Sequence, residues 1–178
     1  MTTSIQRSIR RILTAAWVAI IVVVALPTQA VFAQQAPVGQ WYAEYFDGTD
    51  LAGPVKNTEY LPGPFLNYAL PSESHPSGTV SSVGWSARFT TRATFQQGYY
   101  KFLIRVDDGA RMYLNGRLAF DASGGSGTTY AARVLPMPAG TVTITVEYFE
   151  ADGDNYVEAR WEPTTDLPGE QDRSFTVP

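Results

Sequence analysis

The chain contains no cysteine and only one histidine. The lack of cysteine excludes disulfides, thiol nucleophiles and a lipid-modified cysteine, and a single histidine excludes a multi-histidine zinc site. That residue, His75, lies among serines and prolines with no nucleophile elbow around it, which favours a surface position. A glycosidase needs only two carboxylates, but 17 acidic residues make some such pair inevitable. We therefore expect a protein that is not an enzyme, and a small hydrolase is the remotest interpretation.

The chain also lacks a hydrophobic run long enough to cross a membrane. Its most apolar stretch, residues 12–26, has 15 residues, whereas a membrane span needs about 20. Three arginines precede this stretch and a small-residue exit, 31–33, follows it. This three-part pattern predicts a secretory signal peptide over residues 1–33 and a secreted, extracellular protein that begins at Gln34. The alternative is a protein tethered to the membrane by an uncleaved N-terminal segment.

Positive charge is scarce in the remaining chain. Without the three arginines of the signal, 10 Lys and Arg face 17 Asp and Glu, a net charge of −7. This balance argues against nucleic acid or an anionic membrane surface as a partner, and it is compatible with cation binding. A domain of about this size buries roughly 68–70% of its unfolded surface, so it needs no disulfide to hold a core.

Apolar residues alternate with polar ones along much of the chain, and turn residues punctuate them. Tyr100, Phe102, Ile104 and Val106 form one apolar face, while Lys101 and Arg105 point the other way. The same alternation recurs over 141–148 and 156–161, and further strands are expected at 40–46, 85–94, 110–115, 117–121 and 129–135. The pattern predicts an all-β fold, an antiparallel β-sandwich or barrel-like structure of about 8–10 strands.

Two stretches lack this alternation. Residues 61–83 are rich in proline, serine and glycine, and they are expected to form either a rim over a binding surface or an ordinary surface loop. Residues 163–178 lose all periodicity and are expected to form a flexible C-terminal tail. The sequence therefore predicts a single β-domain over residues 34–162.

Two adjacent carboxylates and a glycine, Asp107, Asp108 and Gly109, separate two of the expected strands. Neighbouring anions repel each other, so they either face water or share a cation. Asp-Gly is also a common hairpin connection, because glycine tolerates a positive φ. Taken alone, the tripeptide favours a plain hairpin turn over a cation site.

Seven motifs follow one another in the order of a known family. They are 41–46, 84–90, 98–102, 107–116, 118–121, 139–140 and 147–150. With this order, the chain resembles the protective-antigen fourteen-kilodalton domain family over about residues 39–162. The resemblance implies a lectin-like β-sandwich, found in exported toxins, glycosidases and adhesins, that recognises carbohydrate as an accessory module.

The resemblance also implies a calcium site. In sugar-binding members such as the yeast flocculation adhesins, two aspartates joined by a cis peptide bond ligate calcium, which coordinates sugar hydroxyls; Asp107 and Asp108 match them. A second loop of those adhesins supplies an asparagine, which Asn155 matches. We add Asp152 and Asp154 to the candidate metal ligands because calcium prefers oxygen donors. The other interpretation of residues 152–155 is a hairpin turn.

Sugar sites combine polar groups with an aromatic ring that covers the apolar face of the sugar. Tyr130 and Tyr156 lie near strand ends or off the apolar face, so they join Asp107 and Asp108 as candidate carbohydrate contacts. Trp41, Trp85, Phe102, Tyr148 and Trp161 are expected to pack in the core. The expected function is the binding of a glycan or polysaccharide, in the context of adhesion. The cofactor that the resemblance implies for this binding is calcium. The alternative is a calcium-independent structural or protein-interaction domain of the cell surface.

Overall fold

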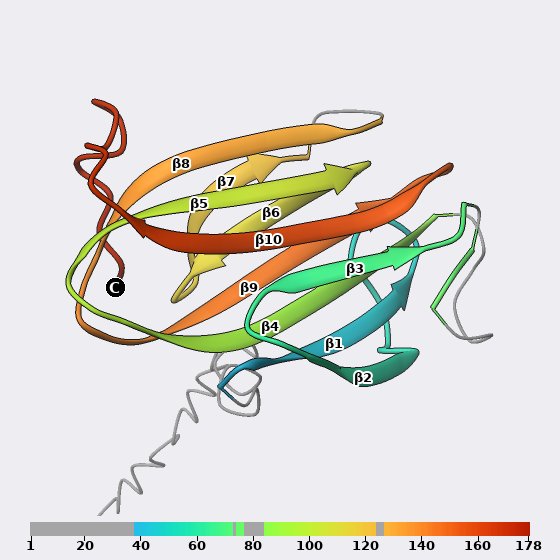
Figure 1. The fold of residues 1–178 in the computed structure, drawn as a ribbon. Coiled ribbons are helices and arrows are strands. Elements are labelled where there is room, and N and C mark those ends of the chain that lie inside the picture. Colours follow the sequence, from blue (N-terminus) through green and yellow to red (C-terminus); the bar gives the residue numbers. More distant parts are fainter. Residues whose placement is uncertain (1–37, 73, 77–83, 124–126) are drawn as a thin grey trace, which may run out of the picture.

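The computed structural model describes residues 38–72, 74–76, 84–123 and 127–178, and the predicted signal peptide at 1–33 lies outside them. The chain forms ten strands in two antiparallel sheets that face each other (Figure 1). No helix occurs in the described ranges, so none there is long and apolar enough to cross a membrane. The strands are β1 (Gln40–Asp47), β2 (Asn57–Pro62), β3 (Leu66–Leu70), β4 (Trp85–Phe95), β5 (Gly98–Asp107), β6 (Gly109–Leu114), β7 (Arg117–Ala122), β8 (Thr129–Met137), β9 (Gly140–Glu150) and β10 (Asn155–Thr164). The predicted all-β sandwich is confirmed.

The two sheets enclose one hydrophobic core. The six-stranded sheet has the order β2-β1-β4-β9-β6-β7, and the four-stranded sheet has the order β3-β10-β5-β8. The alternation of apolar and polar residues places one face of each sheet inside, as in other aligned sandwiches. Four of the aromatic residues predicted to pack in the core are 0% exposed, namely Trp41, Trp85, Phe102 and Tyr148. Trp161 is only partly buried and packs at the margin of the core.

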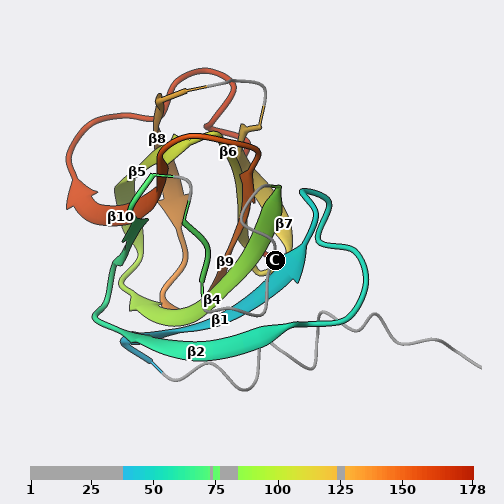
Figure 2. The same ribbon diagram turned by 90° about the vertical axis from the view of Figure 1, so that its right-hand side faces the viewer.

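Short turns lie at one end of the sandwich and longer connections lie at the other. At the left-hand end in Figure 1 the strands are joined by two-residue turns, such as Asn115–Gly116 between β6 and β7. Both residues of that turn have positive φ, 47° and 80°, which matches the Asn-Gly preference of tight hairpins. Longer connections lie at the opposite end, which faces the viewer in Figure 2; their described residues are 48–56, 71–72, 74–76, 84, 123, 127–128 and 151–154. We call this the loop end.

The stretch predicted as irregular, 61–83, contains a strand that the sequence pattern missed. Leu66 and Tyr68 of β3 point into the core, while Asn67 and Ala69 between them are exposed. β3 pairs with β10 and forms one edge of the four-stranded sheet. Five residues between prolines carry too little alternation to stand out from a loop.

The last residues of the chain pack along the open edge between β7 and β8. β10 extends to Thr164, two residues past the boundary expected from the sequence. Beyond it, the side chain of Phe175 is 5% exposed, and the Arg117 guanidinium lies 4.7 Å from the centre of its ring. The Nε of Arg133 on β8 donates to the carboxylate of Asp172 at 2.9 Å. The segment after β10 therefore lacks the alternation of a strand because it forms no strand, although its side chains pack against the sandwich.

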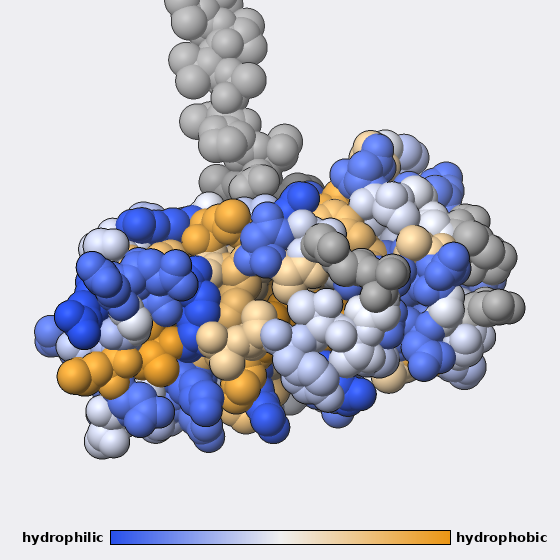
Figure 3. Space-filling view, turned by 90° about the horizontal axis from the view of Figure 1, so that it is seen from above, coloured by the Kyte–Doolittle hydropathy of each residue, from blue (hydrophilic) through white to orange (hydrophobic). Residues whose placement is uncertain are grey.

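Seen from above this edge, the surface carries hydrophobic patches separated by hydrophilic residues (Figure 3). Large single patches usually mark partner interfaces, and scattered ones are normal for a soluble surface.

Replacing Asp172 by alanine is expected to destabilise the protein by roughly 1–3 kcal/mol. Asp172 is 6% exposed, and its loss would leave the partly buried Arg133 without its charged partner. Urea unfolding monitored by tryptophan fluorescence measures the change. Glu170→Ala, an exposed acidic residue in the same segment, is the control and should change stability little. Equal effects of the two substitutions would contradict the structural role of the Arg133–Asp172 pair.

Candidate functional site

The Asp107–Asp108–Gly109 segment crosses from one sheet to the other at the loop end. β5 ends at Asp107 in the four-stranded sheet, and β6 begins at Gly109 in the six-stranded sheet. The hairpin interpretation of this tripeptide is therefore wrong, because a hairpin would pair the two strands. The peptide bond between Asp107 and Asp108 is cis. At Gly109 the backbone of Ser123 comes too close for a larger side chain to fit easily, since a Cβ at Gly109 would lie 3.0 Å from the Cα of Ser123. The φ angle of Gly109 is not positive.

The two carboxylates are buried and connect neighbouring loops. Asp107 is 7% exposed and Asp108 is 9% exposed. Oδ2 of Asp108 accepts a hydrogen bond from the backbone N–H of Ala151 at 2.8 Å, and its Oδ1 lies 3.4 Å from the backbone N of Gly127. Oδ2 of Asp107 lies 3.4 Å from Oγ1 of Thr128. The pair therefore stands between the β7–β8 connection and the β9–β10 connection.

A third carboxylate, Glu150 at the end of β9, is 2% exposed close to this pair. Its pKa is raised to about 7, chiefly by burial; the hydrogen bond with the Tyr148 hydroxyl opposes this shift, and the charges of Asp108, Asp107 and Asp152 add to it. Burial, followed by the charge of Asp108, also raises the pKa of Asp107. Every charged group that raises the pKa of Glu150 or of Asp107 is thus another carboxylate. Oε1 of Glu150 is buried without a hydrogen-bond partner among the residues that the structure describes.

The hydroxyl of Tyr148 ties this buried carboxylate to the turn. It donates to the backbone carbonyl oxygen of Asp107 at 2.5 Å and also contacts Oε2 of Glu150. Tyr148 is 0% exposed and its ring lies 5.2 Å from that of Trp85. A hydrogen bond from a core residue thereby stabilises the backbone of the Asp107–Asp108–Gly109 segment.

The second predicted loop is fastened to the core by Asn155. This residue is 2% exposed; its Oδ1 accepts from Nε1 of Trp85 at 3.2 Å and its Nδ2 donates to the carbonyl of Pro71 at 3.1 Å. Asp152 and Asp154 are exposed on the loop, and the charge of Asp154 contributes to the raised pKa of Asp107. In the described part of the chain, no three His, Cys, Asp or Glu side chains converge as a metal-binding group.

The donor chemistry of the loop end suits a hard cation. It offers carboxylate, amide and backbone oxygens, which are the ligands that calcium prefers. The accumulated negative charge and the unpartnered Oε1 of Glu150 are features that a bound cation would relieve. Asp107 and Asp108 could supply carboxylate ligands, and the loop of Asp152, Asp154 and Asn155 could supply more oxygens after a local rearrangement.

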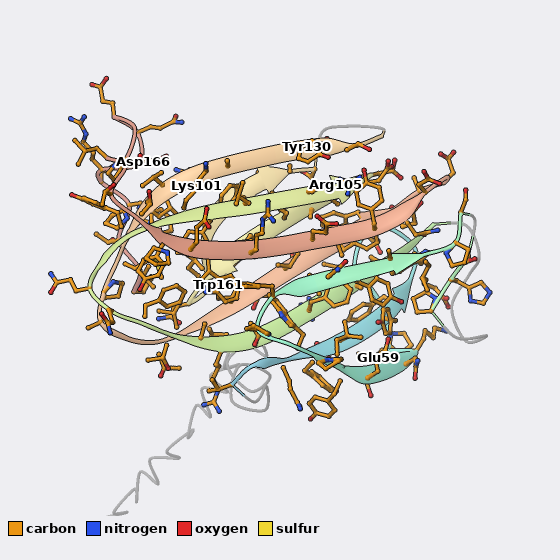
Figure 4. All side chains as sticks on the ribbon, in the orientation of Figure 1. Glu59, Lys101, Arg105, Tyr130, Trp161 and Asp166 are labelled. Carbon is orange, nitrogen blue, oxygen red and sulfur yellow. The ribbon has the colours of Figure 1, made fainter. Side chains whose placement is uncertain are left out.

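The two candidate tyrosines flank an arginine on the outer face of the four-stranded sheet. The Arg105 guanidinium lies 4.4 Å from the centre of the Tyr156 ring and 5.5 Å from that of the Tyr130 ring. Tyr130 is 71% exposed, and Figure 4 shows it on β8 beside Arg105 on β5. The Tyr156 hydroxyl hydrogen-bonds Oγ1 of Thr128, the group beside Asp107. A shallow pocket of about 170 Å³ adjoins Arg105, Tyr130 and Glu158. The tyrosine surface and the carboxylate pair are therefore continuous.

Three residues of this site escaped the sequence analysis: Arg105, Thr128 and Glu150. Alternation placed Arg105 on the outward face, but only the register opposite Tyr130 shows that it meets the tyrosines. Glu150 was detectable, because it lies two residues beyond inward-facing Tyr148 and so has the same parity. Nothing in the local sequence marks Thr128.

Comparisons with known proteins agree with this architecture. The PA14 domain profile matches residues 41–172, and no curated protein sequence matches the chain. An anti-sigma factor domain-containing protein has a similar fold, with a TM-score of 0.61 at 19% identity, over 72% of this chain and 44% of that one. This chain thus spans less than half of that protein.

Two further solved structures share the fold. The PA14 sugar-binding domain from an RTX adhesin matches with a TM-score of 0.57 at 14% identity, over 74% of this chain and 94% of that one. A β-glucosidase from Kluyveromyces marxianus matches with a TM-score of 0.55 at 18% identity, over 71% of this chain and 17% of that one. These low identities establish the fold alone. The profile match covers all ten strands, and the chain therefore belongs to the PA14 domain family.

Proposed function

We propose that the protein is an exported, non-catalytic carbohydrate-binding module whose loop end recognises a glycan. The observation that carries this proposal is the continuity of buried carboxylates with an exposed tyrosine and arginine surface, through Thr128. Sugar sites commonly combine such convergent polar groups with an aromatic ring. The sugar-binding domain of the RTX adhesin, which has the same fold, supports this ligand class.

In the proposed mechanism, Asp107 and Asp108 would hold calcium together with oxygens from the loop of Asp152, Asp154 and Asn155. Bound calcium supplies coordination positions that paired sugar hydroxyls can fill. The protein's own groups orient the ligand: the exposed ring of Tyr130 covers an apolar sugar face, and the hydroxyl of Tyr156 contributes a hydrogen bond. Arg105 offers further N–H donors between the two rings.

The non-catalytic assignment is supported by the position of Glu150. Its pKa of about 7 would suit a general acid, but its side chain is 2% exposed beneath the turn. A general acid must come within hydrogen-bond reach of the oxygen that it protonates. A glycosidic oxygen on the surface has no such access to Glu150.

One observation favours a second candidate, a calcium-independent structural or protein-interaction domain. Asp108 already accepts backbone hydrogen bonds at its Oδ2, as a carboxylate does when it only braces a turn. This candidate predicts a folded protein that responds to neither calcium nor glycan.

Calcium is expected to stabilise the protein, and chelation to reverse the effect. A ligand at about 100 times its dissociation constant adds about 2.7 kcal/mol, which corresponds to roughly 5–10 °C in melting temperature for a domain of this size. Asp107→Asn and Asp108→Asn should lose this response. Asp166→Asn, an exposed carboxylate at the opposite end in Figure 4, is the matched control and should keep it. Identical melting curves in calcium and in EDTA would refute the calcium part of the proposal.

Glycan binding and export are tested separately. A glycan array probed in calcium should show binding that Asp107→Asn and Tyr130→Ala both weaken. Tyr130→Ala removes an exposed ring, so its fold should be unaffected. For export, the secreted protein should begin at Gln34 by N-terminal sequencing; a chain that retains residues 1–33 in the membrane fraction would support the tethered alternative.

A further inference from the structure

A row of charged side chains with alternating sign crosses the outer face of the six-stranded sheet. Its members are register partners on five consecutive strands: Glu44 on β1, Arg88 on β4, Glu147 on β9, Arg111 on β6 and Asp121 on β7. We call these five residues the charged row. Neighbouring strands lie about 4.7–4.9 Å apart, so acceptor and donor groups alternate at that spacing.

The ion pairs of the charged row are long. A guanidinium nitrogen of Arg88 lies 3.7 Å from the carboxylate of Glu44 and another lies 3.7 Å from that of Glu147. Nε of Arg111 lies 3.7 Å from the carboxylate of Asp121. These distances allow charge attraction but are longer than a good hydrogen bond. A guanidinium has five N–H donors, so Arg88 and Arg111 can still donate to a ligand.

One end of the charged row is deeply buried. Glu44 is 1% exposed, its Oε2 has no hydrogen-bond partner among the described residues, and burial raises its pKa. Glu147, in the middle of the row, is 8% exposed and accepts a hydrogen bond from the Tyr113 hydroxyl at 3.1 Å. Burying ionisable groups without full hydrogen bonding costs free energy, so the charged row is poorly explained as a source of stability.

An open pocket of about 530 Å³ lies over the middle of the charged row. Arg88, Glu147 and Arg111 line it from the sheet, Phe149 adds an aromatic side chain, and residues 49–51 contribute from the β1–β2 connection. Small-molecule sites usually measure about 300–1,000 Å³, so the pocket is large enough for a small ligand.

The β1–β2 connection is held in place beside the pocket. Oγ of Ser86 donates to the carbonyl of Gly48 at 2.7 Å and accepts from the N–H of Leu51 at 3.1 Å. Ser86 is 0% exposed on β4, directly beneath this connection. These bonds fix the rim of the pocket in the absence of ligand, which lowers the ordering cost of binding.

We propose that this pocket is a second, calcium-independent site that binds one neutral hexose or pentose unit. A sugar hydroxyl both donates and accepts hydrogen bonds, so adjacent hydroxyls can satisfy the alternating arginines and glutamate. The pocket lining carries two arginines and two carboxylates, Asp50 and Glu147, a balance that gives an anionic ligand no net attraction. The choice of a sugar as ligand rests on the proposed function. The location of the second site does not, because neither Asp107 nor Asp108 lines the pocket.

Saturation-transfer NMR on the full chain in EDTA, with glucose, galactose, mannose and xylose at tens of millimolar, tests the proposal. At least one sugar should receive saturation from the protein. Arg111→Met keeps an unbranched side chain over Phe149 but removes the N–H donors, and it should weaken binding roughly tenfold or more. Arg160→Met, an exposed arginine on the other sheet, should leave binding unchanged.

Amide chemical shifts provide a measurement that does not depend on any variant. Addition of the bound sugar should shift the amides of residues 49–51, 88, 111 and 147–149. Failure of all four sugars to receive saturation, or shifts confined to 107–108 and 151–156, would overturn the second site. The EDTA condition silences the calcium-dependent site, so loss of calcium-dependent glycan binding with retained sugar binding in EDTA would contradict only the proposed loop-end function.

Discussion

Replacing Glu150 by glutamine should stabilise the calcium-free protein by about 2–3 kcal/mol at pH 9. The pKa of this carboxyl is raised from 4.5 to about 7 in the folded protein, chiefly by burial. Each pKa unit corresponds to about 1.4 kcal/mol, which sets an upper limit of about 3.4 kcal/mol, and water at the loop end reduces it. Glutamine keeps polar side-chain atoms that can hydrogen-bond the Tyr148 hydroxyl, but it never ionises.

The expected pH dependence has a definite sign. The pKa of Glu150 is higher in the folded than in the unfolded state, so its contribution to stability is complete below pH 4.5 and is lost as pH rises through about 7. The benefit of Glu150→Gln should therefore shrink to below about 1 kcal/mol at pH 5. Urea unfolding in EDTA at both pH values measures it, with the partly exposed Glu158→Gln as control. A benefit that is equal at both pH values would contradict the raised pKa.

Calcium should oppose this effect if it binds beside Asp107 and Asp108. A nearby divalent cation favours the ionised form of a carboxyl and lowers its pKa. The advantage of Glu150→Gln at pH 9 should then become smaller in calcium than in EDTA. An advantage of the same size in both conditions would count against a cation at this position.

Replacing Trp85 by alanine should cost about 3–5 kcal/mol, the range observed for deletion of a large buried side chain. The ring of Trp85 is 0% exposed and lies 6.0 Å from that of Tyr45, 6.4 Å from that of Tyr68 and 5.2 Å from that of Tyr148. Tyr68 belongs to the four-stranded sheet and the other two to the six-stranded sheet. Trp85 thus joins the two sheets near the loop end, and urea unfolding monitored by circular dichroism measures its contribution.

Trp85→Phe separates packing from hydrogen bonding. Phenylalanine fills much of the space but leaves the buried Oδ1 of Asn155 without the donor at 3.2 Å, a loss of about 1–3 kcal/mol. Because Asn155 fastens the β9–β10 connection, this variant should also weaken any calcium response of the loop end. If Trp85→Phe is as stable as the wild type, the bond to Asn155 contributes nothing to the fold.

Alternation along the chain predicted eight of the ten strands, all but β2 and β3, and four of the five aromatic residues expected in the core are fully buried. Phe102 and Tyr148, for example, occupy the inward positions that parity assigns them. Parity did not reveal which sheet each strand joins, because pairing is decided by contacts between distant segments. For that reason Asp107–Gly109 looked like a hairpin turn, although it links the two sheets.

The same limit applies to the candidate site. The sequence indicated acidic residues at Asp107, Asp108 and 152–154, but not that Asn155 would be buried against Trp85. It also gave no sign that Glu44, Arg88 and Glu147 would fall in one row, since their alignment depends on the register of three strands. Individual side chains were predictable here, and their neighbours were not.

The separation of turns and loops to opposite ends also determines how the domain would be presented on a surface or beside another protein. β1 starts, and the last residues finish, at the end that carries the two-residue turns (Figure 1). An attachment close to the start of β1 or to the last residues would therefore point Asp107, Asp108 and Tyr130 away from the support. A fusion partner or an anchoring surface could be exchanged on that side without obstructing the approach of a large polymer from the other.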